Sequence, residues 1–269
     1  MAAYTQPALY AVLLWWFSTG VILWLDHRPR RTHRASMAAG TLVLAAALCA
    51  IGASAGDASA SGAYTAFTAA VLVWGWQEMS YYMGFVSGPK PAACAPGVRG
   101  LDRFLAALAT RLWHEFAIVL GGLAILALVW GTPNKFALWT YATLVLMNLS
   151  ARLNLFLGVR NLNAEWLPEH LRYLACYLTR KPMNLLFPVS VSLGTVAAAL
   201  LARTALGAEV PEHEVVGFTA LAALMALATL EHWFLVLPLP STALWQWSLP
   251  TRAAPATIES PERAGHPRD

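Results

Sequence analysis

The sequence predicts an all-α integral membrane protein, a bundle of about seven transmembrane helices. Of its 269 residues 58% are apolar and only 12% are charged, whereas ordinary soluble proteins have about 25% charged residues. The mean hydropathy is +0.53, and the apolar residues gather in windows of the ~20 residues that cross a bilayer. This composition excludes a disordered chain, a nucleic-acid-binding domain with a solvated basic face, and a secreted module built on disulfides.

Each expected helix is identified by its own apolar window. The first and the third to fifth carry Trp or Tyr near their ends, as interfacial anchors do. The second is almost entirely Ala, Leu and Gly, a composition that permits close helix packing, and the third, fourth, fifth and seventh contain polar patches. In chain order the windows are 7–25, 36–54, 63–86, 104–130, 136–158, 183–202 and 215–237.

The basic residues predict the orientation of the bundle. Fifteen Lys and Arg residues fall in the loops and tail on one side of the expected spans, and two fall on the other side. By the positive-inside rule the N-terminus lies outside and the C-terminus in the cytoplasm. The net charge of +4 therefore reflects membrane topology rather than affinity for nucleic acid. We expect one transmembrane domain, 1–250, and a disordered cytoplasmic tail, 251–269.

The three cysteines give no sign of a redox or metal motif. Cys49, Cys94 and Cys176 are far apart and form no CxxC pair. On the predicted topology Cys94 and Cys176 face the cytoplasm, where thiols stay reduced. We therefore interpret all three as structural residues.

Polar residues inside the expected spans are the strongest functional signal. An ionisable side chain at the centre of a membrane helix costs about 2.5–3.5 kcal/mol on insertion scales, so each one suggests a functional site. Those of the third, fourth and seventh spans, with Asn148 of the fifth, lie about six to ten residues from the cytoplasmic ends, in one layer. They are Glu78, His114, Glu115, Asn148, Glu231 and His232, and Arg152 and Asn154 follow Asn148 on the fifth span.

Three interpretations of this layer remain open. Its carboxylates and imidazoles suit iron, manganese or zinc, with Glu78, His114, Glu115, Glu231 and His232 as ligands. However, the adjacent Glu–His pairs differ from the Glu-x-x-His spacing of di-iron bundles. Alternatively the groups form an interhelical polar network that includes Asn148, Arg152 and Asn154. In the third interpretation, His114 or His232 binds the magnesium of a tetrapyrrole or a haem iron.

The stretch 159–182, after the fifth window, predicts a short amphipathic helix on the inner membrane surface. Pro168 is a favourable first residue for a helix, and leucines then recur at helical spacing. This segment is either a lid that packs against the bundle or a docking surface for a partner helix. The leucines are Leu167, Leu171, Leu174 and Leu178.

Several long motifs resemble one known family. They are Leu-Trp-Trp-Phe-Ser-Thr-Gly at 14–20, Trp-Gly-Trp-Gln-Glu-Met-Ser at 74–80, Leu-Trp-His-Glu at 112–115, the run 150–163, Leu-Pro-Glu-His-Leu-Arg-Tyr-Leu at 167–174, Arg-Lys-Pro-Met-Asn-Leu-Leu-Phe-Pro at 180–188 and Glu-His-Trp-Phe at 231–234. Over about 14–249 the chain resembles the photosynthetic complex assembly protein family of purple bacteria, multi-span proteins encoded near the reaction-centre H subunit. The resemblance implies a role in assembling reaction-centre and light-harvesting complexes and in bacteriochlorophyll levels.

Two hypotheses of function follow. In the first the protein is an inner-membrane assembly factor that acts on bacteriochlorophyll or newly made subunits, through the polar layer and the segment 159–182. In the second it is a membrane metalloenzyme with Glu- and His-ligated iron that modifies a bacteriochlorophyll precursor. A transporter is disfavoured because no pair of broken helices is visible in the sequence.

Overall fold

The computed structural model describes residues 2–162, 164, 167–238, 244–245 and 247–248. Within these residues every regular element is helical, which confirms the predicted all-α class. The predicted tail, 251–269, lies outside the described residues. The named helices are α1 (Ala2–Asp26), α2 (Arg30–Ser54), α3 (Ala60–Tyr82), α4 (Gly100–Ala109), α5 (Leu112–Leu128), α6 (Phe136–Leu157), the 3₁₀ helix η2 (Glu169–Tyr177), α7 (Leu186–Ala205) and α8 (Glu212–Phe234).

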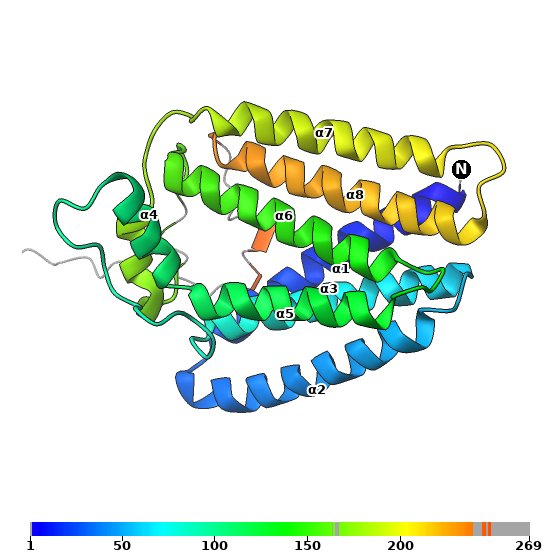
Figure 1. Ribbon diagram of the computed structural model, residues 1–269, viewed down its shortest axis with the longest axis horizontal. Helices are drawn as coiled ribbons and strands as arrows, with labels where there is room; N and C mark the ends of the chain where they lie inside the picture. The colour runs from blue at the N-terminus through cyan, green and yellow to red at the C-terminus, as the bar shows by residue number, and fades with distance from the viewer. Residues whose placement is uncertain (1, 163, 165–166, 239–243, 246, 249–269) are drawn as a thin grey trace, which may run out of the picture.

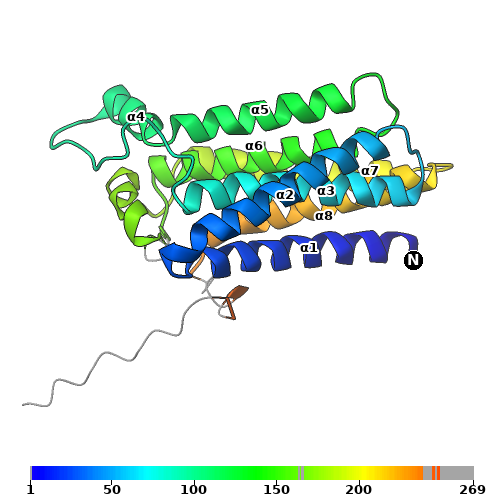
Figure 2. The same cartoon turned by 90° about the horizontal axis from the view of Figure 1, so that it is seen from below.

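The long helices run side by side along the length of the molecule (Figure 1). Helix α3 is the most central, because it packs against α1, α2, α5, α6 and α8. Figure 2 shows α5 on one face of the bundle and α1 on the opposite face. The connections 27–29, 83–99 and 158–185 meet at one end, together with α4 and η2 (Figure 1). This end carries most of the clustered arginines, and we call it the basic end.

Fewer helices than the predicted seven are long and apolar enough to cross a membrane. Among the described residues four meet that criterion, or five if the bent pair α4–α5 counts as one span. Helices α3 and α6 are not among them, and each carries polar side chains near the basic end, Gln77 and Glu78 on α3 and Asn148 and Arg152 on α6. Both nevertheless run alongside the apolar helices (Figure 1). The qualifying spans are Ala3–Asp26, Arg30–Ser54, Leu186–Ala205 and Glu212–Phe234.

Small side chains fill the core between α2, α3, α5 and α6. Ala66 and Ala70 of α3 are almost fully buried, against residues such as Ile125 and Tyr141. Small residues let helices approach closely where no hydrophobic force separates helix from lipid. In contrast, large apolar side chains such as Leu120 and Leu193 remain exposed on the outer surface. This pattern supports contact with lipid.

The expected fourth span, 104–130, is not one helix. It is divided into α4 and α5, which meet at an angle of 66°. The chain before α4 lies against the break: Lys90 N–H donates to the carbonyl oxygen of Ala109 (3.3 Å), and His114 N–H donates to that of Ser87 (3.0 Å). Backbone groups released by a break inside a membrane protein need such partners. The expectation of one continuous fourth span was therefore wrong.

Candidate functional site

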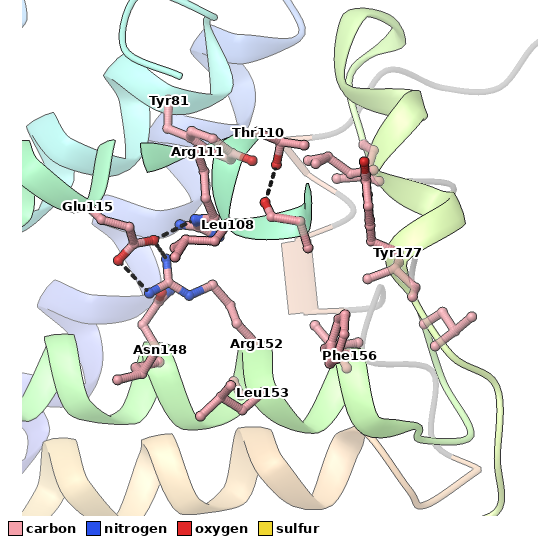
Figure 3. A pocket seen from close by; sticks show the side chains of 18 of the residues that line it. Tyr81, Leu108, Thr110, Arg111, Glu115, Asn148, Arg152, Leu153, Phe156 and Tyr177 are labelled. Atoms are coloured by element: carbon pink, nitrogen blue, oxygen red, sulfur yellow. Dashed lines mark hydrogen bonds and ion pairs between the residues drawn. The ribbon is translucent and has the colours of Figure 1, made fainter. Parts of the chain in front are cut away.

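A cavity of about 410 Å³ lies at the basic end of the bundle (Figure 3). Residues of α1, α3, α4, α5, α6 and η2 line it, and most of its wall is apolar, including Phe104, Leu108, Leu153 and Phe156. Its size falls within the range of about 300–1,000 Å³ that is typical of small-molecule sites. The remaining lining is polar and gathers at the end of the cavity next to the α4–α5 break.

Two arginines and one glutamate form this polar end (Figure 3). Nε of Arg111 lies 2.6 Å from Oε1 of Glu115, and Nη1 of Arg152 lies 3.0 Å from the same oxygen. Nη2 of Arg152 donates to Oε2 of Glu115 (3.3 Å). The three side chains are 19–26% exposed, so they are reachable from the cavity. Their formal charges leave one net positive charge.

Local structure explains how these side chains meet. Arg111 is at the break between α4 and α5, and Glu115 is one turn further along α5, at the i,i+4 spacing that pairs side chains on one helix face. Arg152 approaches from α6. The guanidinium of Arg111 also lies 4.8 Å from the ring centre of Tyr81, as a cation–π contact.

A second pair of predicted site residues, Glu78 and His114, adjoins the cavity. Glu78 lines the cavity, and its Oε1 is 3.9 Å from Nε2 of His114. His114 is fully buried and packs against Tyr81, with 4.6 Å between ring centres. In the described part of the chain neither ring nitrogen of His114 has a hydrogen-bond partner. Buried polar atoms are rarely left unpaired, so this pair is a candidate for contact with water or ligand.

His232 belongs to a separate polar network. Its Nδ1 is hydrogen-bonded with the carbonyl oxygen of Ala228 (2.7 Å) and its Nε2 with Oγ of Ser150 (2.9 Å). Oγ of Ser190 accepts from both Ser150 and Asn154 (2.9 and 3.0 Å). The network links α6, α7 and α8. Both ring nitrogens of His232 are therefore engaged, and the residue does not line the cavity.

Asn184 extends this network, although the sequence analysis did not select it. Its Nδ2 donates to Oδ1 of Asn154 (3.0 Å) and to the carbonyl oxygen of Gly158 (2.9 Å). Its Oδ1 accepts from the backbone N–H groups of Leu186 and Phe187 (2.8 and 3.2 Å). Asn184 thus joins the end of α6 to the start of α7. The available signal was an Asn just before an apolar helical stretch, which is a typical capping pattern.

The five residues predicted to hold iron do not come together. Glu115 is bound to arginines, His232 is in the α6–α8 network, and Glu231 does not line the cavity. Across the described ranges no group of three or more His, Cys, Asp or Glu residues could hold a metal ion. Adjacent residues on a helix point about 100° apart, so each neighbouring Glu–His pair is divided between two environments. Of these five, Glu78 and His114 lie within ion-pair distance of each other, 3.9 Å.

The predicted amphipathic segment packs against the cavity. Leu167, Leu174 and Leu178 line it, and Leu171 is 1% exposed. The segment forms a 3₁₀ helix rather than an α-helix. We call residues 167–178 the lid. Nη2 of Arg103 on α4 donates to the carbonyl oxygen of Tyr177 (2.9 Å) at its end.

His170 of the lid packs against the turn after α3. Its ring lies close to Gly84, at the place where a Cβ of that residue would be. Partial burial, together with the positive charge of Arg30, lowers the pKa of His170 below its usual range, while a backbone hydrogen bond with Tyr82 acts in the opposite direction.

A disulfide between Cys94 and Cys176 joins the lid to the loop before α4. The expectation that these two cysteines are free thiols was therefore wrong. The half-cystines are 82 residues apart in the sequence, and only the folding of two loops over the same end brings them together. Cys49 is free and exposed on α2.

Replacing Cys94 with serine is expected to loosen the lid. Loss of a cross-link that closes a long loop lowers the free energy of unfolding by about 2–4 kcal/mol. Here the loss weakens the attachment of residues 167–178 to the rest of the protein. Limited trypsin digestion followed by mass spectrometry should show faster cleavage after Arg172 and Arg180 in Cys94→Ser. Cys49→Ser is the matched control, and equal cleavage rates in the two variants would contradict this role.

Comparison with known proteins shows the family to which the chain belongs. The chain is 42% identical over 259 residues, 94% of each protein, to the "Uncharacterized 30.4 kDa protein in puhA 5′region" of Rhodobacter capsulatus. No solved structure matches the chain. A family model described as "Protein of unknown function (DUF3623)" matches residues 1–256, and the chain belongs to this DUF3623 family.

Proposed function

We propose that the protein is an assembly factor for photosynthetic reaction-centre and light-harvesting complexes in the bacterial inner membrane. It would hold bacteriochlorophyll in the cavity at the basic end and deliver it to newly made subunits. The observation that carries this proposal is the cavity itself, which has apolar aromatic and leucine walls, one polar end and a lid. Such a site suits a membrane-soluble molecule with a large apolar body.

Genomic position and motifs support the same proposal. The Rhodobacter capsulatus relative lies in the 5′ region of puhA, in a photosynthesis gene cluster. The motifs that resemble the assembly family contribute side chains to this one cavity: Glu78 from 74–80, Glu115 from 112–115, Arg152 from 150–163 and Leu174 from 167–174. A shared feature of the family would then be the ligand site rather than the outer surface of the helices.

The basic end would also be where a partner subunit meets the protein. Large apolar side chains are exposed there, including Leu101 and Leu105 on α4 and Leu185 before α7. The surrounding arginines favour anionic lipid headgroups or an acidic segment of a partner. A pigment leaving beneath α4 and the lid would therefore emerge beside this surface.

Filling the cavity tests the proposal. In a deletion strain complemented with Leu153→Trp, we expect the absorbance of assembled complexes to fall to the level of the uncomplemented strain, because the larger ring occupies the cavity. Leu146→Trp is the matched control, on the same helix but 63% exposed and outside the cavity. Immunoblots would establish equal amounts of the two variants.

Two outcomes would contradict the assembly role. The first is normal complex formation with Leu153→Trp at a normal protein level. The second is accumulation of a single pigment precursor in the deletion strain, which would favour the metalloenzyme hypothesis. Normal pigment with missing complexes is the result that the assembly proposal predicts.

A further inference from the structure

Charged side chains at the polar end of the cavity identify a feature of its ligand. Arg111, Glu115 and Arg152 are each less than one third exposed, and they border a wall that is otherwise apolar. Keeping charges away from water is costly unless they are paired. Leucines at these positions would complete the apolar wall without that cost. The arginines are therefore best explained by something that binds to them.

The pairing at this end is incomplete. Nε of Arg111 and Nη1 of Arg152 lie within ion-pair distance of Oε1 of Glu115, and Nη2 of Arg152 donates to Oε2 of Glu115. A guanidinium has five N–H donors, and among the described residues the buried Nε of Arg111 and Nη1 of Arg152 have no hydrogen-bond partner. Glu78 is a second carboxylate of the cavity lining, so a further acid would pair with these unpartnered N–H groups rather than with a net charge.

The neighbouring groups are consistent with an anion at this position. Arg111 and Glu115 stand at the N-terminus of α5, where the peptide dipoles favour negative charge. The other cavity carboxyl, that of Glu78, has its Oε1 near His114. Asn148, from α6, lies beside the arginines (Figure 3) and offers an amide N–H₂ group.

We propose that the cavity binds an amphipathic ligand with one acidic group, a carboxylate or phosphate, which pairs with Arg111 and Arg152 while the apolar body lies under α4 and the lid. This inference rests on the proposed function and narrows it. Within the pigment class the site would select a tetrapyrrole that retains a free acid over its ester. A fatty acid or an anionic lipid offers the same chemistry from another source.

The test compares two probes that differ only in whether one carboxylic acid is free or esterified. Purified full-length protein in detergent is titrated with pyropheophorbide a and with its methyl ester, and binding is followed by pigment absorbance and fluorescence. We expect the acid to bind at least about tenfold more tightly, since a hydrogen-bonded charged group contributes about 1.5–3 kcal/mol. Oleate and phosphatidylglycerol are titrated in parallel as the lipid sources.

Two variants of opposite expected effect separate recognition from folding. Arg152→Gln should weaken binding of the acid by about 10- to 100-fold and leave the ester unchanged. Glu115→Gln removes the competing carboxylate and should tighten binding of the acid alone. Arg160→Gln is the matched control, because Arg160 is exposed and does not line the cavity.

The outcomes distinguish this inference from the proposed function. Equal binding of the acid and the ester would agree with pigment binding in the cavity but would contradict recognition of an acidic group. An equal loss of binding of both probes in Arg152→Gln would contradict that recognition in the same way. The opposite result is that oleate or phosphatidylglycerol binds in a way that depends on Arg152, while neither pyropheophorbide probe binds. That result would support recognition of an acidic group and contradict the proposal that the cavity holds pigment.

Discussion

Gly88→Val should lower the thermal unfolding midpoint of the purified protein by about 5–10 °C. A Cβ at this position would overlap the carbonyl oxygen of Ala109 and the backbone of Thr110 and Arg111. Because these are backbone atoms at the helix break, no side chain can rotate away to make room. The loop must then separate from the break, which removes the hydrogen bonds made by Lys90 and His114.

The control for this change is another loop glycine. Gly56 has no atom within 4 Å of a Cβ built on it, so Gly56→Val should leave the midpoint within about 1–2 °C of the parent, as surface substitutions usually do. Differential scanning fluorimetry in detergent would measure all three proteins. If Gly88→Val unfolds at the same temperature as Gly56→Val, the loop does not support the break.

Asn184→Ala is expected to destabilise the protein by about 3–5 kcal/mol. The side chain donates to Asn154 and Gly158 and accepts from two backbone N–H groups at the start of α7. Its removal leaves several of these groups buried without partners, and each such group costs about 1–3 kcal/mol. Reversible unfolding in mixed detergent would measure the change.

A second asparagine provides the comparison for Asn184. Asn148 is on α6, and its Oδ1 has no hydrogen-bond partner in the described part of the chain. Asn148→Ala should therefore change the free energy of unfolding by less than about 1 kcal/mol. A similar loss in both variants would show that the hydrogen bonds of Asn184 contribute little to the fold.

Apolar patterning made most of the fold predictable. The windows for α1, α2, α7 and α8 overlap helices of membrane-spanning length, because continuous apolar stretches suit only a lipid-facing or deeply buried helix. The break at Thr110 and Arg111 was not predictable from periodicity. It depends on the loop that packs against it, and such tertiary partners are invisible in a single window.

The sequence predicted how deep in the bundle the candidate site residues lie, but not which of them lie together. Glu78, Glu115 and Arg152 do line one cavity at the basic end, but His232 and Asn154 belong to the α6–α8 network. The rotation of each helix about its axis decides which neighbour faces inward, and sequence position leaves that rotation open. Thus Glu115 faces the arginines while His114 is buried behind Tyr81.

The division of the fourth span has a consequence for the surrounding bilayer. Helix α5 has 17 residues, which at about 1.5 Å each extend about 25 Å, short of the ~30 Å hydrocarbon core. A helix shorter than the core produces hydrophobic mismatch, which is relieved when the adjacent lipids thin. The cavity lies at the end of α5 that adjoins α4. The leaflet should therefore be thinnest, and most easily crossed by an amphipathic molecule, at the entrance to the site.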